Sequence, residues 1–119
     1  MDLTTLERLP LWIGGRATAA LTTRYGEVTN PATGEVVRHV PLANAADVDA
    51  AVKSATAALP GWRAWPALRR ARVLMKFREL MEAHKKDLAK IVTQEHGKTL
   101  PDAEGSISRG IEGVEFAAG

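Results

Sequence analysis

The hydrophobic pattern changes at Leu42, and this change constrains the fold more than any other feature of the sequence. Between residues 11 and 42, glycine and proline turn signals separate short runs of β-branched residues, a pattern typical of short strands. From residue 44 to residue 119, apolar residues recur at helical spacing. We therefore predict a short β-hairpin region over 11–42, followed by three or four α-helices over 44–119, so that helix dominates.

The β region contains two clear turn signals. A Gly-Gly pair stands at 14–15, and the sequence Asn-Pro-Ala-Thr-Gly at 30–34 separates two β-branched runs at 25–29 and 35–40. Two or three strands in hairpins satisfy this pattern. Because an isolated hairpin is only marginally stable in water, we expect these strands to pack against another element.

The first predicted helix begins after Asn44, a residue that caps helices well, with the acid Asp47 in its first turn. Pro60 and Gly61 are expected to end it. Its apolar stripe consists of Val48, Ala51, Val52, Ala55, Ala58 and Leu59.

Three further helical stretches follow. Pro66 suits the first turn of the second helix, and Gly97 is placed to end the third. The predicted buried faces are Val73, Leu74, Phe77, Leu80 and Met81, then Leu88, Ile91 and Val92, then Ile107, Ile111, Val114 and Ala118. Gly105, Gly110 and Gly113 interrupt the last stretch, which indicates either close helix–helix approach or a poorer helix.

Length and composition narrow the class of protein. The 119 residues suit one domain, 45% of them are hydrophobic, and the net charge is only +2. No run of about 18 apolar residues predicts a membrane span, and residues 1–7 do not resemble a signal peptide. Cysteine is absent, which excludes disulfides, thiolate metal sites and thiol nucleophiles from this chain. We expect a cytoplasmic domain, or a piece of one.

Three short motifs resemble known sites without meeting their requirements. Gly-Lys-Thr at 97–99 resembles the end of a phosphate-binding loop, but that loop needs a glycine where Val92 stands. Residues 106–110 lack the strand and the first glycine of a nucleophile elbow. The three histidines lack the spacing of metal ligands. We therefore predict no catalytic residue, no cofactor-binding residue and no metal site from these motifs.

Residues 63–90 form a basic stretch. They contain nine lysines and arginines against three acids, and Arg69, Arg72 and Lys76 share one helix face. A nucleic-acid-binding protein would show such a patch, but aromatic residues that could stack on bases are not interleaved with it, since Phe77 falls on the apolar face. A solvated helix face is the favoured interpretation, and we expect no nucleic-acid partner and no membrane partner.

Several longer motifs together resemble one family. They are Trp-Ile-Gly-Gly at 12–15, Val-Thr-Asn-Pro-Ala-Thr-Gly-Glu-Val at 28–36, Asp-Val-Asp-Ala-Ala-Val at 47–52, Arg-Ala-Arg-Val-Leu at 70–74 and Glu-His-Gly-Lys-Thr at 95–99. This set resembles the opening of the aldehyde dehydrogenase superfamily. The run Arg-Gly-Ile-Glu-x-Val-Glu-Phe-Ala at 109–117 is similar to the CoA-acylating methylmalonate-semialdehyde (malonate-semialdehyde) dehydrogenases in particular.

The resemblance implies an α/β family fold and an NAD-dependent oxidoreductase. In that family a cysteine thiolate attacks the aldehyde, hydride passes to NAD, and the acyl group passes to coenzyme A with loss of carbon dioxide. The family chain is several times longer and forms homo-oligomers. Residues 1–119 then correspond to its N-terminal part, without the nucleotide-binding core and the catalytic domain. We expect this chain to bind neither NAD nor coenzyme A and to be inactive alone.

The resemblance carries one functional residue onto this chain. Arg109 stands where the subfamily has an arginine that meets the carboxylate of the semialdehyde, and a guanidinium suits that task because it donates two parallel hydrogen bonds. The alternative is that Arg109 only pairs with Glu112 or Glu115 on its own helix. The resemblance also places Glu95 near a structural monovalent cation, with the carbonyls of residues 28 and 29.

Two other kinds of function stay open. One is a helical interaction module that docks on full-length dehydrogenase subunits, and the other is a basic nucleic-acid-binding domain. The apolar faces of the predicted helices are suited to burial against a partner. An exposed apolar patch larger than a few hundred Å² favours association. The isolated chain is therefore predicted to be oligomeric or loosely packed.

Overall fold

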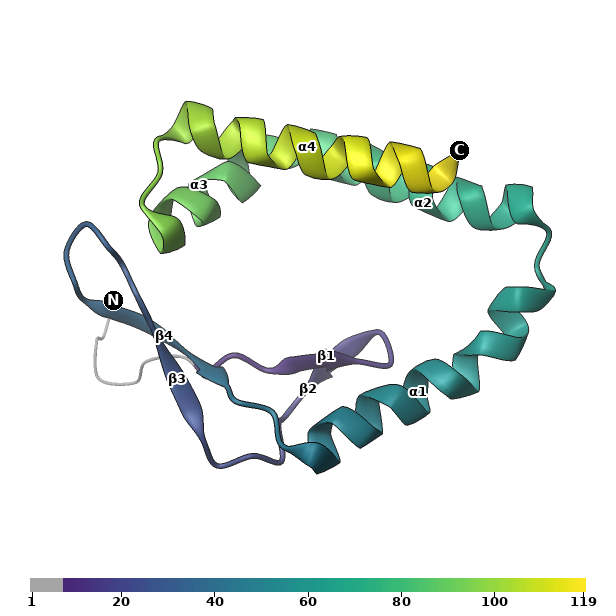
Figure 1. The fold of residues 1–119 in the computed structure, drawn as a ribbon, viewed down its shortest axis with the longest axis horizontal. Helices are drawn as coiled ribbons and strands as arrows, with labels where there is room; N and C mark the ends of the chain where they lie inside the picture. Colours follow the sequence, from purple (N-terminus) through teal and green to yellow (C-terminus); the bar gives the residue numbers. More distant parts are fainter. Residues whose placement is uncertain (1–7) are drawn as a thin grey trace. The chain divides into compact units, whose positions relative to one another are not determined.

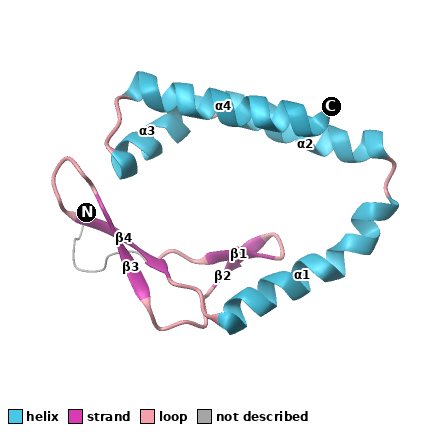
Figure 2. Cartoon of the chain, in the orientation of Figure 1, coloured by secondary structure: helices cyan, strands magenta, loops and turns pink. Residues whose placement is uncertain are grey.

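The computed structural model describes residues 8–119, and the opening stretch on which the expectation of no signal peptide depends lies outside them. Short strands come first and helices follow (Figure 2), so the predicted order of hairpins and then helices is confirmed. The elements are β1 (Leu11–Ile13), β2 (Arg16–Thr18), β3 (Tyr25–Thr29), β4 (Val36–Pro41), α1 (Ala45–Ala64), α2 (Ala67–Ala83), α3 (Lys85–His96) and α4 (Leu100–Ala118). Although the length suits one domain, the chain divides into two compact units, 1–61 and 62–119.

In the first unit, β1 and β2 form an antiparallel hairpin through the predicted Gly-Gly turn (Figure 1). Ile13 pairs with Arg16, so Gly14 and Gly15 are the two central residues of the turn. Their φ angles are +63° and +77°, in the left-handed region that side chains with a Cβ disfavour. Two consecutive positive φ angles give the turn that matches the right-handed twist of its strands.

A second antiparallel hairpin joins β3 to β4, in register from the Tyr25–Pro41 pair to the Val28–Arg38 pair, after which the register shifts and Thr29 pairs with Val36. Its loop is the predicted Asn-Pro-Ala-Thr-Gly turn. Asn30 organises this loop, because its carbonyl accepts from the Gly34 amide at 2.7 Å and its side-chain oxygen accepts from the Ala32 amide at 3.0 Å. The described residues thus form two separate two-stranded sheets, where two or three strands were predicted.

The segment between the two hairpins is attached to the start of α1 by Asp47. Asn44 Oδ1 accepts from the Asp47 amide at 2.9 Å, and Asp47 Oδ2 accepts from the Asn44 amide at 3.0 Å, so the predicted cap is confirmed as a reciprocal one. Asp47 also accepts from the amides of Leu21, at 2.6 Å, and Thr22, at 3.2 Å. The amides of this segment therefore bond to a carboxylate instead of to a neighbouring strand.

The predicted end of the first helix at Pro60-Gly61 is wrong. α1 continues through both residues to Ala64. Pro60 lies inside the helix one turn before its end, where it lacks the N–H that would donate to the carbonyl of Thr56, and α1 accommodates this loss. The helix ends instead before Pro66, because a proline ring disfavours helical backbone at the residue that precedes it, here Trp65.

The apolar stripe of α1 is not buried as predicted. Val48, Val52 and Leu59 are each more than half exposed. Val48 and Val52 line an open hollow together with Leu11 and Ile13 of β1, so this stripe lies near the first hairpin without being buried by it.

In the second unit, α4 packs along α2 and against α3 (Figure 1). Among the described residues, the buried apolar core consists of Ala89, Ala103 and Ile111. Gly97, with φ of +85°, ends α3 as predicted. Thr99 then caps α4, and its hydroxyl oxygen lies 3.4 Å from the Asp102 amide that donates to it.

The three glycines do not prevent α4 from forming one continuous helix. A methyl group at Gly110 would lie 3.5 Å from the terminal carbon of Met81, which is an ordinary contact, and one at Gly113 would meet nothing within 4 Å. The packing of α4 therefore requires a glycine at neither of these two positions.

Candidate functional site

Arg109, the predicted carboxylate-binding residue, lies midway along α4 with an exposed side chain. Its Nη2 donates to the hydroxyl oxygen of Ser106 at 3.1 Å, one turn earlier on the same helix. Lys98, in the connection between α3 and α4, donates to the same oxygen at 3.0 Å. Two cationic side chains therefore meet at one hydroxyl group.

Neither of these cations is paired with an acid in the part of the chain that the structure describes. The alternative role of Arg109, pairing with Glu112 or Glu115, is not what the structure shows, because Glu115 pairs with Arg78 of α2 at 2.6 Å. Asp102, near the start of α4, accepts from the Thr99 hydroxyl at 2.8 Å. The guanidinium of Arg109 keeps most of its donors available for a ligand.

The sequence motifs contain all three residues, Lys98, Ser106 and Arg109, without revealing their contact. Lys98 belongs to the Gly-Lys-Thr motif, which does not meet the requirements of a phosphate-binding loop. Its neighbours have structural roles, since Gly97 ends α3 and Thr99 caps the start of α4. Ser106 and Arg109 stand three residues apart, a spacing that brings side chains together on a helix. That spacing is the signal that could have found the pair, whereas the contact from Lys98 depends on the turn between the helices.

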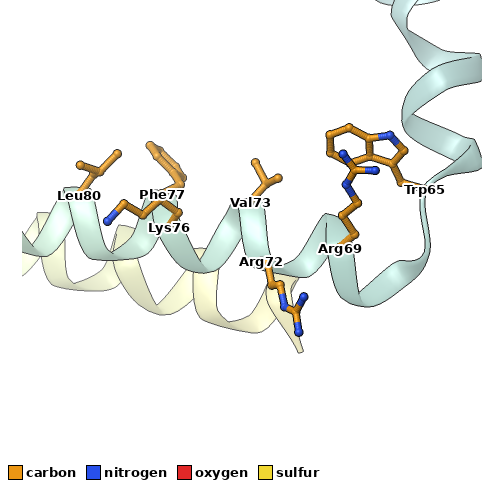
Figure 3. A pocket seen from close by; sticks show the side chains of 7 residues that line it. All are labelled: Trp65, Arg69, Arg72, Val73, Lys76, Phe77 and Leu80. Carbon is orange, nitrogen blue, oxygen red and sulfur yellow. The ribbon is translucent and has the colours of Figure 1, made fainter.

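A second feature of the same unit is a groove on α2 (Figure 3). Val73, Phe77 and Leu80 project from the side of α2 that faces away from α4, and they are 45%, 50% and 47% exposed. The predicted burial of these three residues is therefore wrong. Among the described elements, α4 makes the main contact with α2 and covers the side that carries Met81, while α3 touches α2 less.

Cationic side chains line part of the groove. The Arg69 guanidinium lies 3.7 Å from the centre of the Trp65 ring, a cation–π contact visible in Figure 3. Lys76 lines the groove beside Phe77, while Arg72 points away from the apolar side chains. Aromatic and cationic residues thus share this surface, contrary to the separation expected from the sequence.

Metal and cofactor sites are not evident among residues 8–119. No group of three or more potential ligands from histidine, aspartate and glutamate gathers there. Glu95 belongs to the second unit and residues 28 and 29 to the first, so the monovalent-cation site stays a prediction. The two sheets are antiparallel hairpins, and these residues do not build the parallel βαβ unit that holds a dinucleotide.

The sequence of the chain matches one protein family over most of its length. Residues 18–119 match the sequence model of the aldehyde dehydrogenase family. The chain belongs to the aldehyde dehydrogenase family.

No helix of the described residues is long and apolar enough to cross a bilayer.

Individual members of the family are similar over nearly the whole chain. The malonate-semialdehyde dehydrogenase of Halalkalibacterium halodurans is 45% identical over 118 residues, which are 99% of this chain and 24% of that protein. Malonate-semialdehyde dehydrogenase 1 of Geobacillus kaustophilus is 47% identical over 108 residues, 91% of this chain and 22% of that protein. The chain thus spans about a quarter of the length of the curated relatives that it matches.

Solved structures of the family have the same fold over this region. A protein of Sinorhizobium meliloti described as a methylmalonate-semialdehyde dehydrogenase, in complex with NAD, matches 98% of this chain and 24% of its own at a TM-score of 0.93 and 46% identity. The methylmalonate-semialdehyde dehydrogenase of Oceanimonas doudoroffii matches 96% and 23% at a TM-score of 0.91 and 40% identity. The predicted aldehyde dehydrogenase-like fold is confirmed.

Proposed function

We propose that this chain supplies the N-terminal part of an NAD-dependent, CoA-acylating malonate- or methylmalonate-semialdehyde dehydrogenase. In the proposed reaction, malonate semialdehyde, NAD⁺ and coenzyme A give acetyl-CoA, carbon dioxide and NADH. The hydride leaves the aldehyde carbon for NAD⁺, and the new thioester forms between that carbon and the sulfur of coenzyme A. The methylmalonate substrate gives propionyl-CoA in the same way. Such a reaction belongs to valine, pyrimidine or inositol breakdown.

The observation that carries this proposal is the free guanidinium of Arg109. An aldehyde dehydrogenase for a semialdehyde has to recognise a carboxylate as well as an aldehyde. Within residues 8–119, Arg109 keeps donors available because it donates to the hydroxyl of Ser106, while its acidic helix neighbour Glu115 is engaged by Arg78. Similarity to enzymes named for carboxylated aldehydes supports the same role.

The chemistry of this reaction needs groups that the 119 residues do not contain. A thioester that another thiol can collect requires a thiolate nucleophile, and the chain has no cysteine. The described residues also offer no fitting site for NAD, so we assign no step of the hydride transfer to them. The proposal therefore includes that the isolated chain is inactive. NADH formation from the chain, NAD, coenzyme A and malonate semialdehyde above a protein-free blank would contradict it.

A chimeric enzyme tests the positive part of the proposal. Residues of this chain replace the 118-residue stretch that they match in the Halalkalibacterium halodurans relative. We expect the chimera to form acetyl-CoA from malonate semialdehyde and to prefer this substrate to propanal, which lacks the carboxylate. A chimera that oxidises propanal well and malonate semialdehyde no better would refute the assigned substrate class.

The proposal extends to location and assembly. A cytoplasmic homo-oligomer fits a chain without cysteine, which needs no oxidising compartment. The exposed groove of α2 also favours a second candidate, a helical module that docks on full-length dehydrogenase subunits. Co-purification of the tagged chain with such a subunit from the source cells would support the second candidate over an independent role.

A further inference from the structure

We propose that Lys98 is a second carboxylate-binding cation and that Ser106 holds it beside Arg109. The inference rests on the proposed function, because the ligand is the carboxylate of the semialdehyde substrate. It assigns a binding residue and a positioning residue to which the sequence motifs gave no such role. The three residues are called the carboxylate cluster below.

The geometry of the carboxylate cluster brings two like charges together. Lys98 Nζ and Arg109 Nη2 lie 3.0 Å and 3.1 Å from the same oxygen, that of the Ser106 hydroxyl. The Ser106 hydroxyl in turn donates to the Asp102 carbonyl at 3.2 Å, one turn earlier on α4. The hydroxyl thus accepts twice and donates once, and its position is fixed by the helix backbone.

The charge of the carboxylate cluster is not neutralised by the protein around it. Within residues 8–119, neither cation of the cluster forms an ion pair. By contrast, Lys76 and Lys90 each form an ion pair with an acid three residues away, at 2.9 Å and 3.2 Å. Two neighbouring cations without an acid repel each other, and this repulsion is relieved when an anion binds between them.

The donors that remain match a carboxylate. After its bond to Ser106, the ammonium of Lys98 keeps two N–H groups and the guanidinium of Arg109 keeps four. A carboxylate has two oxygens with about four acceptor sites, so it can bond to both cations at once. Lys98 and Ser106 are half-buried, which limits the competition from water on that side of Arg109.

The test compares single substitutions in the chimera that carries this chain. Lys98→Met removes the charge and keeps the length of the side chain, Lys98→Arg keeps the charge, and Ser106→Ala removes the shared acceptor. Lys90→Met is the matched control, because it removes an exposed lysine of α3 outside the cluster. Arg109→Gln reports on the proposed function itself. The readouts are kcat and KM for malonate semialdehyde and for propanal.

We expect Lys98→Met to lower kcat/KM for malonate semialdehyde by about tenfold or more, the usual size of a lost charge-assisted hydrogen bond. The loss should appear mainly in KM, as for a contact made equally in ground state and transition state. For this variant, kcat and KM for propanal should stay unchanged. With malonate semialdehyde, Lys98→Arg should retain most of the kcat/KM, and Ser106→Ala should give a kcat/KM between those of Lys98→Arg and Lys98→Met. A general loss of structure would reduce both substrates together.

Failure of this inference differs from failure of the proposed function. If Arg109→Gln lowers the preference for malonate semialdehyde while Lys98→Met behaves as Lys90→Met does, the inference is refuted and the proposed function stands. If Arg109→Gln leaves the preference unchanged, both are refuted.

A second measurement applies to the 119-residue chain if the chimera does not fold. Amide resonances are followed by NMR while malonate is added, with potassium chloride at matched ionic strength as the reference titration. Saturable shifts at residues 98–109 that Lys98→Met abolishes would support the inference. Shifts that are absent, or that equal those caused by chloride, would overturn it.

Discussion

Arg78 and Glu115 join α2 to α4 across 37 residues of sequence, with Arg78 Nε 2.6 Å from Glu115 Oε1. The hydrogen bond to Glu115, together with its charge, raises the pKa of the arginine further above its usual range. The two side chains are 42% and 47% exposed, so water and salt screen the pair. The contribution of this ion pair is to the alignment of α2 with α4, because it holds one helix in register along the other.

We therefore expect Glu115→Gln to lower the thermal midpoint of the chain only slightly, because an exposed ion pair contributes little to stability. The difference from the unsubstituted chain should shrink as salt is added. Thermal unfolding followed by circular dichroism at low and high salt checks this, with Glu112→Gln as a control at an exposed acid of the same helix. A large loss that persists at high salt would contradict the prediction.

Gly113→Ala should stabilise the chain by about 0.5–1 kcal/mol, the difference between alanine and glycine inside a helix. Gly113 lies within α4, and a methyl group there meets nothing within 4 Å. Denaturant unfolding measures the change. Gly97→Ala is the opposite control: its φ of +85° disfavours a Cβ, so that substitution should destabilise.

Asp47 makes the first unit sensitive to acid. Hydrogen bonds from the backbone amides of Leu21, Asn44 and Thr22 lower the pKa of its carboxyl, against the opposing effect of burial. A group whose pKa is lower in the folded state stabilises above its unfolded pKa, and this contribution is lost as the pH falls through the folded value. We expect the loss to begin near pH 4, where an unfolded aspartate titrates.

The acid sensitivity is measured by unfolding the chain at a series of pH values. Asp47→Asn should flatten the part of the profile below about pH 4 and lower stability above it. Asp49→Asn is the matched control, since that side chain is exposed and pairs only with Lys53. Equal profiles for the two variants would show that Asp47 does not carry the effect.

Arg109→Gln in the chimera should lower kcat/KM for malonate semialdehyde by about 10–100-fold, because a charged partner of the carboxylate is lost. Arg109→Lys should recover part of the activity, since it restores the charge without the planar pair of donors. Steady-state kinetics with malonate semialdehyde and propanal check this. A decrease that is the same for both aldehydes would mean that Arg109 supports structure and not the carboxylate.

The groove of α2 should drive self-association of the isolated chain. Phe77 is 50% exposed beside Val73 and Leu80, whereas Phe116, which is 90% exposed, does not line the groove. We expect Phe77→Ser to shift the chain toward monomer in sedimentation experiments more than Phe116→Ser does. An unsubstituted chain that sediments as a monomer and unfolds cooperatively would refute the prediction.

Local signals in the sequence predicted the elements well. The glycine pair at 14–15, the loop at 30–34 and the cap at Asn44 each act through their own backbone geometry, which a short stretch of sequence contains. The prediction from Pro60 was wrong because α1 accommodates a proline in its interior, and the helix ends before Pro66 instead.

Tertiary partners were less predictable. An apolar stripe indicates that a face is suited to burial, but not which element covers it, so Val73 and Phe77 were wrongly placed in a core. The candidate site shows the same difference between what a short stretch of sequence contains and what depends on tertiary contacts. Arg109 came from a resemblance and its contact with Ser106 follows from their helical spacing, whereas the approach of Lys98 required the turn between α3 and α4.

The hydrogen bonds of Asp47 also determine how the first unit opens. Because one carboxylate holds the amides of Leu21, Thr22 and Asn44, none of these amide protons can exchange with deuterium while that carboxylate stays in place. The link between the hairpins and the first turn of α1 should therefore exchange at one common rate, as a single cooperative opening, although 22 to 26 positions separate the two segments in the sequence.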